Sequence, residues 1–174
     1  MKKKIIITGG LGYIGTELCK IYSGVSWHHD ITIIDNRFIS ERVNQLRNWN
    51  MNFIHGDILD KDLIKKICKD ADVIHHLAGV TEVPRVKSES TNDKDNKIKL
   101  VAVEGTQNIL DSINNKCKII LPSTHVVYEG IEKVKKDILE DEETNPVLSY
   151  AISKDLNEKQ LKKSGKNYVI LRLG

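Results

Sequence analysis

The chain has 174 residues, of which 40% are hydrophobic and 29% charged, which is typical of one soluble globular domain. Its 27 basic and 24 acidic residues leave a net charge of +3 with no dense basic patch, so composition gives no argument for nucleic acid as a partner. The N-terminus has only three isoleucines before Thr8, and we expect neither a signal peptide nor a membrane partner from so short an apolar run.

The cysteines are three and lie far apart, at Cys19, Cys68 and Cys117, with no C-x-x-C pair. Their apolar-periodic surroundings favour buried thiols over a disulfide framework or a zinc site. Unpaired thiols are typical of a reducing compartment, so we expect a cytoplasmic protein.

Short apolar runs alternate with segments of helical periodicity along the whole chain. The expected strands are Lys4–Thr8, Ile31–Ile34, Met51–Ile54, Asp72–Leu77, Lys118–Leu121 and Tyr168–Leu173. The expected helices are Ile14–Tyr22, Ile39–Trp49, Asp60–Lys69, Ile98–Ile113 and Leu148–Lys163. Residues 86–97 are typical of a mobile loop or an exposed helix start, and the charge-rich residues 129–146 of a loop. This alternation predicts an α/β fold with a parallel sheet covered on both faces.

A glycine-rich segment, TGGLGYIG at residues 8–15, follows the first expected strand and opens a helix. It contains G-x-G-x-x-G, and also glycines three apart at Gly9, Gly12 and Gly15. A pyrophosphate needs backbone N–H groups at close range and a helix N-terminus aimed at it, and side chains at Gly9 or Gly12 would block that approach. A β-carbon at Gly15 would push helix and strand apart.

An acidic residue, Asp35, follows Gly15 by twenty residues at the end of the second expected strand. A carboxylate at this place suits the hydrogen-bonding of a ribose diol and repels a 2′-phosphate, which favours NAD over NADP. Arg37 nearby weakens that preference slightly. The alternative for Asp35 is a turn or cap residue.

Eight motifs in order resemble the extended short-chain dehydrogenase/reductases, also called the NAD-dependent epimerase/dehydratase family. They are TGGLGYIG, Asp35-Asn36, GDILD (56–60), HHLAG (75–79), VEGTQNIL (103–110), STHVVY (123–128), NPVLSYAISK (145–154) and ILRLG (170–174). The resemblance runs from residue 3 to the last residue. It implies a doubly wound Rossmann sheet of strand order 3-2-1-4-5-6 and one NAD-binding domain over residues 1–174. Relatives continue into a C-terminal substrate lobe, which this sequence lacks, so we expect a fragment or a truncated relative.

The resemblance also implies roles for individual residues. Asp57 would bind the adenine amino group with Ile58 nearby, and Leu77, Ala78 and Gly79 would line the nicotinamide ribose. The residues expected to bind NAD are Gly9, Gly12, Tyr13, Ile14, Gly15, Asp35, Asn36, Asp57, Ile58, Leu77, Ala78, Gly79, Tyr150 and Lys154. The expected catalytic residues are Thr124, Tyr150 and Lys154.

The segment SYAISK at 149–154 places Tyr150 and Lys154 on one helical face, which by itself is typical of a helix start. Within the family pattern, the tyrosine exchanges a proton with a sugar hydroxyl. A free phenol has a pKa near ~10, and we expect Lys154 and an oxidised nicotinamide, both positive, to lower it. The Thr124 hydroxyl would bind the reacting sugar oxygen, or else it caps the turn after its strand.

Two positions after Thr124 bear on the type of reaction. Dehydratases of the family carry Asp-Glu there, whereas this chain has His125 and Val126, and valine cannot transfer a proton. The sequence therefore favours a nucleotide-sugar epimerase that oxidises and re-reduces C4. A sugar dehydratase or reductase, a 3β-hydroxysteroid-type enzyme and a non-catalytic NAD-binding relative remain alternatives.

Further departures from the family pattern are Ala102, where relatives have asparagine, and an inserted Glu129. The pair His75-His76 invites a metal site, but neighbours on a strand point to opposite faces, so we expect none. His125 is either a new general acid or a packed or solvent-facing residue. Relatives dimerise through two helices, so we expect a homodimer. Apolar residues that serve this contact or the core are Leu100, Val101, Ile109, Leu156 and Leu161.

Overall fold

The computed structural model describes residues 2–80, 91–131 and 137–174. The strands are β1 (Lys4–Thr8), β2 (Asp30–Asp35), β3 (Asn52–His55), β4 (Val73–His76), β5 (Lys118–Thr124) and β6 (Asn167–Leu173). The helices are α1 (Tyr13–Ser23), α2 (Ser40–Asn48), α3 (Lys61–Cys68), α4 (Asn92–Ser112) and α5 (Ser149–Lys163), with short 3₁₀ turns at Ser26–His28 and His125–Tyr128. No described helix is both long and apolar enough to cross a membrane.

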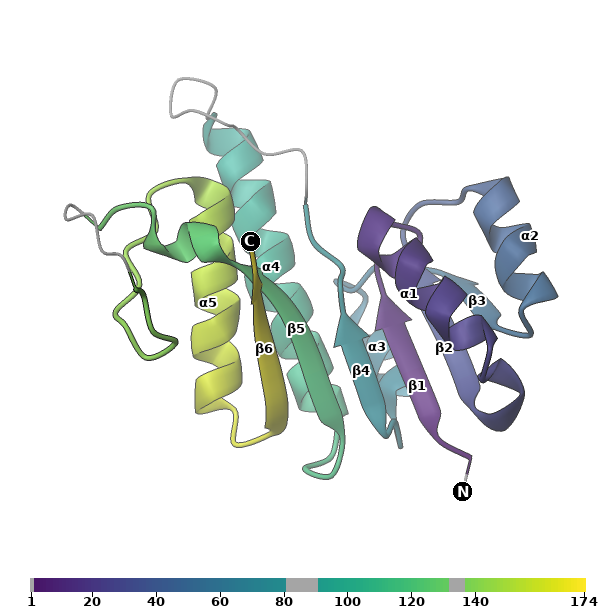
Figure 1. The fold of residues 1–174 in the computed structure, drawn as a ribbon. Coiled ribbons are helices and arrows are strands. Elements are labelled where there is room, and N and C mark those ends of the chain that lie inside the picture. Colours follow the sequence, from purple (N-terminus) through teal and green to yellow (C-terminus); the bar gives the residue numbers. More distant parts are fainter. Residues whose placement is uncertain (1, 81–90, 132–136) are drawn as a thin grey trace.

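The six strands form one parallel sheet in the order β3-β2-β1-β4-β5-β6, which confirms the predicted fold class and strand order. Figure 1 shows α1 and α2 in front of the sheet and α3, α4 and α5 behind it. Because the order reverses direction between β1 and β4, the carboxyl ends of these two strands open a crevice at one edge of the sheet.

Each face of the sheet carries its own apolar core. Isoleucines of β1 and β2, among them Ile7 and Ile33, pack under α1 and α2, while Ile6, Ile74 and Ile119 pack under α3, α4 and α5. The three central residues of KIIIT are all isoleucine, with no polar alternation, because a strand with helices on both faces has no solvent side.

The α1 face of the sheet is covered unevenly. Over β5 and β6, no described helix lies on this face, as Figure 1 shows. Leu171 and Leu173 are accordingly 45% exposed, whereas Ile5 and Ile7 on the covered half are 3% exposed or less.

Several element bounds differ from the sequence prediction. Helix α4 begins at Asn92 rather than Ile98, because the Thr91 hydroxyl accepts a hydrogen bond from the Lys94 N–H and Asp93 favours the helix N-terminus. Residues 86–90 of the predicted loop lie outside the described residues. Strand β5 continues to Thr124 because the whole of β6 pairs with it.

Candidate functional site

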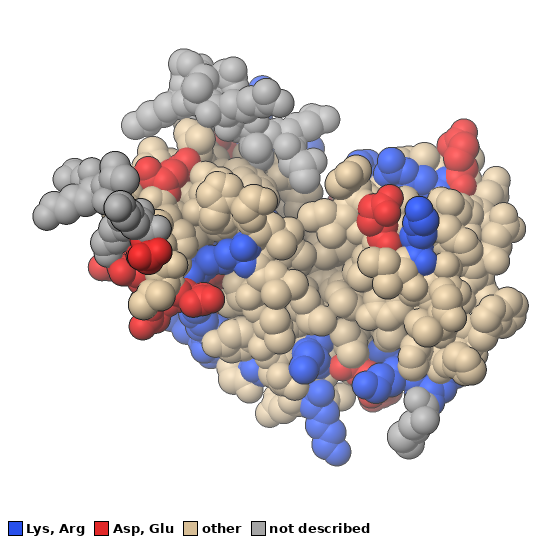
Figure 2. Space-filling model, in the orientation of Figure 1, with Lys and Arg blue, Asp and Glu red and all other residues tan. Residues whose placement is uncertain are grey.

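A pocket of about 370 Å³ lies at the carboxyl edge of the sheet, between the glycine loop and the start of α5. It contains ten of the residues predicted for the site: Gly9, Gly12, Tyr13, Ile14, Gly15, Leu77, Gly79, Thr124, Tyr150 and Lys154. Val80, Pro122, Ser123 and Leu173 complete the lining, and sequence reasoning did not single them out. Figure 2 shows the front of the molecule, on which much of the surface is neither acidic nor basic.

The glycine loop is shaped by contacts within the chain itself. Gly9 has φ +68, and a β-carbon there would lie 2.7 Å from the Ala78 backbone; at Gly15 it would lie 2.5 Å from Gly10. At Gly12 a β-carbon would meet the Gly9 carbonyl at 3.1 Å. The backbone that follows β4 therefore by itself excludes a side chain at Gly9.

The N-terminus of α1 opens directly into this pocket. Gly12 is its N-cap and makes no side-chain cap hydrogen bond, so the backbone N–H groups of the first turn are not shielded by a capping side chain. Glycine backbone at close range and a helix N-terminus in a pocket suit a pyrophosphate, so the residues present fit a dinucleotide.

Asp35 ends β2 beside the loop and is buried. One of its carboxylate oxygens accepts from the Leu11 N–H at 3.0 Å, and the other accepts from the N–H and Nε of Arg37 at 3.0 and 3.3 Å. Asp35 therefore holds the glycine loop in shape, which agrees with the alternative reading of Asp35 as a turn residue. It also pairs with Arg37, the residue expected to weaken the preference for NAD over NADP.

The remaining predicted cofactor residues do not line the pocket. Asn36 is exposed and donates to the Asp57 carboxylate at 2.9 Å, which places the two beside each other. The side chain of Ile58 is buried in the core against Gly105. Ala78 donates its N–H to the Thr8 hydroxyl at 3.2 Å and packs its backbone on Gly9.

Tyr150 and Lys154 lie together at the other side of the pocket, on the first turns of α5. The Lys154 Nζ lies 5.9 Å from the centre of the Tyr150 ring and donates to the Pro122 carbonyl at 2.9 Å. Burial lowers the pKa of Lys154 to about 8. Burial raises the pKa of Tyr150 in the chain alone, whereas the expected lowering was assigned to Lys154 together with an oxidised nicotinamide.

Thr124 is buried at the end of β5 and lines the pocket, and its hydroxyl accepts from the Val126 N–H at 3.2 Å. Thr124 therefore both caps the turn after its strand and lines the pocket. His125 is exposed, and its Nδ1 lies 3.0 Å from the Leu173 carbonyl oxygen. His125 and Val126 line a separate hollow of about 560 Å³ outside the glycine-loop pocket, which does not support His125 as the general acid there.

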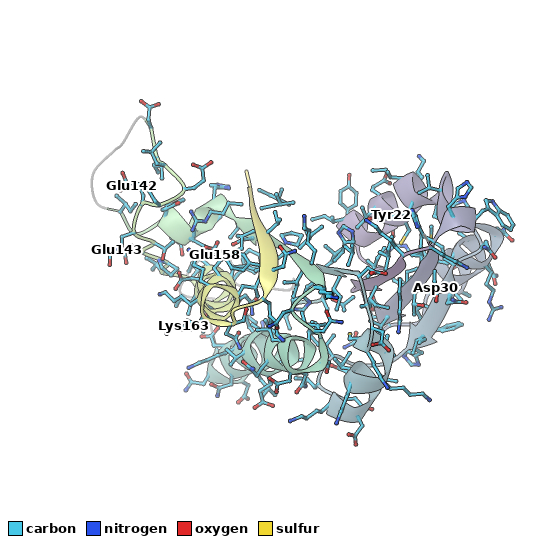
Figure 3. The ribbon with its side chains drawn as sticks, turned by 90° about the horizontal axis from the view of Figure 1, so that it is seen from below. Tyr22, Asp30, Glu142, Glu143, Glu158 and Lys163 are labelled. Atoms are coloured by element: carbon cyan, nitrogen blue, oxygen red, sulfur yellow. The ribbon has the colours of Figure 1, made fainter. Side chains whose placement is uncertain are left out.

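A buried ionic cluster, which the sequence did not reveal, secures α5 to the sheet. Glu158 accepts from the Ser123 hydroxyl at 2.6 Å and from Nε and Nη2 of Arg172 at 3.0 and 2.6 Å. Burial by itself would raise the pKa of Glu158, but hydrogen bonds from Arg172 and Ser123 outweigh it and the pKa is lowered. In Figure 3, Glu158 lies where α5 faces β6. The signal available in the sequence was Arg172, a charged residue within the otherwise apolar ILRLG motif.

The inserted Glu129 has a structural role at the start of the same helix. Its Oε1 accepts from the N–H groups of Val147 and Leu148 at 2.7 and 2.6 Å. Because Leu148 is the N-cap of α5, this departure from the family pattern supports the entry of the helix that carries Tyr150.

The two histidines of β4 face opposite sides of the sheet, as predicted. His75 lies 2.8 Å from the Tyr22 hydroxyl of α1, whereas His76 contacts Thr8 and Thr106 on the side of α4. No group of three or more His, Cys, Asp or Glu side chains in the described parts of the chain could hold a metal ion.

A family model described as the 3-beta hydroxysteroid dehydrogenase/isomerase family matches residues 6–170. A UDP-N-acetyl-alpha-D-glucosaminuronate decarboxylase from Bacillus cytotoxicus is 32% identical over 91% of this chain and 49% of its own length. A UDP-N-acetylglucosamine 4-epimerase from Methanobrevibacter ruminantium M1 superposes with a TM-score of 0.79 and 30% identity, over 99% of this chain and 55% of that one.

A UDP-glucuronic acid 4-epimerase from Bacillus cereus, solved with UDP-glucuronic acid and NAD, superposes with a TM-score of 0.76 at 27% identity. That superposition covers 97% of this chain and 55% of the epimerase. The chain spans about half the length of the curated relatives it matches, such as 49% of the decarboxylase. The family resemblance seen in the motifs is thereby confirmed over nearly the whole sequence.

Proposed function

The chain belongs to the 3-beta hydroxysteroid dehydrogenase/isomerase family, and on that premise we propose that it binds NAD and acts on a nucleotide sugar as a C4 epimerase. The observation that carries the proposal is the shared pocket, in which Thr124, Tyr150 and Lys154 stand opposite the glycine loop.

NAD, when bound, would supply hydride transfer to and from the sugar carbon. The chain would hold its pyrophosphate at Gly9, Gly12 and the N-terminus of α1. Asp35 and the Asn36–Asp57 pair would meet the adenosine half, and the Asp35 oxygens already hold the loop in shape.

The chain's own chemistry at C4 is the movement of one proton. The Tyr150 phenolate accepts the hydroxyl proton as the alcohol is oxidised and returns it on reduction, while Thr124 hydrogen-bonds the same oxygen. Burial raises the pKa of Tyr150, and the positive charges of Lys154, 5.9 Å from the ring centre, and of an oxidised nicotinamide would act against it by favouring the phenolate.

The two residues that follow Thr124 bear on whether the enzyme eliminates a group from the sugar. Val126 has no proton to give or accept, and His125 lines another hollow, so among the described residues these two do not supply the acid–base pair that elimination needs in this pocket. This favours epimerisation over dehydration.

The test is interconversion of UDP-glucose and UDP-galactose by the chain, with NADH binding followed by fluorescence. We expect Tyr150→Phe to slow turnover by about 10²-fold or more while NADH affinity stays within a few-fold. Tyr168→Phe, an exposed tyrosine on β6, is the matched control and should leave both unchanged. Equal rates in Tyr150→Phe and the unaltered protein would refute the mechanism.

Two alternatives separate in the same assay. One alternative is an NAD-binding protein without turnover, which would bind NADH tightly and convert no nucleotide sugar. A reductase would change the amount of free NADH in proportion to product, consuming it when a carbonyl is reduced and releasing it when an alcohol is oxidised, whereas an epimerase recycles its cofactor.

We further propose one NAD-binding domain over residues 1–174, a cytoplasmic location and a homodimer through α4 and α5. Leu100, 43% exposed, and Leu156 are available for such a contact. Ile109 and Leu161 are not, because both are fully buried in the core, and Val101 packs against that core. Sedimentation of Leu100→Glu against the unaltered protein tests the dimer.

A further inference from the structure

A chain of buried polar side chains connects the two halves of the site. The Thr8 hydroxyl lies 2.9 Å from Nδ1 of His76, and Nε2 of His76 lies 3.0 Å from the Thr106 hydroxyl. Asn157 of α5 donates its Nδ2 to the Thr106 hydroxyl and to the Ala102 carbonyl, each at 2.8 Å. All four polar side chains are almost fully buried: Thr8, His76, Thr106 and Asn157.

Both ends of this chain meet the site. Thr8 directly precedes Gly9, and its hydroxyl also accepts from the N–H of Ala78, whose backbone touches Gly9. Asn157 lies one helical turn after Lys154 on α5.

The residue at position 102 supports a structural role for this chain of hydrogen bonds. The family pattern has an asparagine there, and in this chain the α4 backbone at Ala102 is instead reached by Asn157 from α5. The tie between β4 and α4 runs through His76 and Thr106.

We propose that His76 is a positioning residue, which holds Tyr150 and Lys154 in place relative to the glycine loop. This rests on the proposed function, in which those two side chains act on a ligand held by that loop. Burial, and then the charge of Lys154, lower the pKa of His76 to about 3, so the imidazole is neutral at neutral pH and offers one donor and one acceptor to its two threonines.

The first test is the dissociation constant of NADH in a double-mutant cycle. His76→Leu should weaken NADH binding about tenfold in the unaltered chain and less than about twofold in a Lys154→Met background, because residues that act through one another are not additive. Equal factors in both backgrounds would overturn the proposal.

Two conservative variants sharpen this test. The amide of glutamine reaches the place of the imidazole Nε2, and that of asparagine the place of Nδ1. His76→Gln keeps a partner for Thr106 and should restore most of the affinity lost in His76→Leu, whereas His76→Asn keeps a partner only for Thr8 and should not. Equal affinity of the two variants would count against transmission through Thr106.

The matched control is His75→Leu. His75 is also a buried histidine of β4, and its replacement removes one hydrogen bond to Tyr22 on the other face of the sheet. We expect its NADH affinity to stay within about twofold of the unaltered chain. A loss as large as that of His76→Leu would show general loosening and would overturn the proposal.

A readout without any cofactor separates this inference from the proposed function. The pKa of Lys154 can be measured from the pH dependence of its acylation, followed by mass spectrometry. Among the described residues, the groups that face its ammonium are Tyr150, the Pro122 carbonyl and, from β4, His76. His76→Leu should move this pKa from about 8 toward that of an exposed lysine, while His76→Gln and His75→Leu keep it near 8. An unmoved pKa in His76→Leu would overturn the proposal even if NADH did not bind, and failure of NADH to bind would refute only the proposed function.

Discussion

At the scale of single residues, the site depends on groups that the fold holds in costly states. Gly9 adopts a left-handed backbone conformation against the end of β4, and Lys154 keeps an ammonium out of water. The effect of each state on stability can be measured, because the chain offers other glycines and an exposed lysine as controls.

Gly9→Ala should lower the free energy of unfolding by about 2–4 kcal/mol, since it combines a positive φ with a backbone clash at 2.7 Å. Gly165→Ala has a similar φ of +67 and open space, and should cost only about 1 kcal/mol. Gly79→Ala, with open space and no positive φ, should stay within about 0.5 kcal/mol. Urea denaturation measures all three, and equal losses at Gly9 and Gly165 would contradict the clash.

Lys154→Met should stabilise the fold at pH 7 by on the order of 1–3 kcal/mol while weakening any ligand that needs the charge. The pKa of Lys154 is about 8 in the folded protein and 10.5 for a lysine in the unfolded chain. The folded state therefore loses this proton first as the pH rises. The unaltered protein therefore gains stability between pH 8 and 10.5, and the advantage of Lys154→Met shrinks there. Denaturation at pH 7 and 9.5 checks this, with exposed Lys163→Met as control; a constant advantage would contradict it.

At the scale of elements, α5 is the part whose placement decides the chemistry. Consecutive residues fix it in two directions: Asn157 toward α4 and β4, and Glu158 toward β5 and β6. Its hydrophobic contact is narrow, since polar residues occupy Ser153, Asp155, Asn157 and Glu158 among its buried positions. Polar pairing therefore orients a helix that apolar periodicity would leave free to rotate.

Glu158→Gln should destabilise the protein by about 3–5 kcal/mol, because it leaves the mostly buried Arg172 guanidinium without its counter-charge. Lys159→Met removes an exposed i,i+4 partner of Asp155 on the same helix and should cost less than about 1 kcal/mol. The comparison is made by thermal and urea unfolding. Similar losses in the two variants would mean that the buried pair is no stronger than a surface one.

At the scale of the whole molecule, the sheet is covered fully on the α3–α5 face and only half on the α1 face. Neighbouring strands β5 and β6 thus have one apolar side under helices and one apolar side in water, and the pocket lies beside the uncovered side.

Leu121→Ala, on the covered face, should cost about 2–5 kcal/mol, whereas Leu171→Ala, 45% exposed on the opposite face, should cost less than about 1 kcal/mol. The difference in midpoint of urea unfolding measures this. Comparable losses would mean that something covers Leu171 in solution, for instance a second copy of the chain, and repeating the measurement at several protein concentrations would reveal it.

The sequence by itself determined the order of strands and helices and the glycine loop, because apolar period and glycine spacing are local patterns with local physical causes. The strand order and the roles of Tyr150 and Lys154 followed from the resemblance to a family, and ten of the predicted site residues meet in one pocket. The tertiary structure decided what depends on contacts between distant segments: that Ile58 belongs to the core against Gly105, that α4 begins at Asn92, that His76 bonds Thr106 of α4, and that Glu158 ties α5 to β5. Burial also set the direction of the Tyr150 and Lys154 pKa shifts, since desolvation depends on everything packed around a group and on no single stretch of chain.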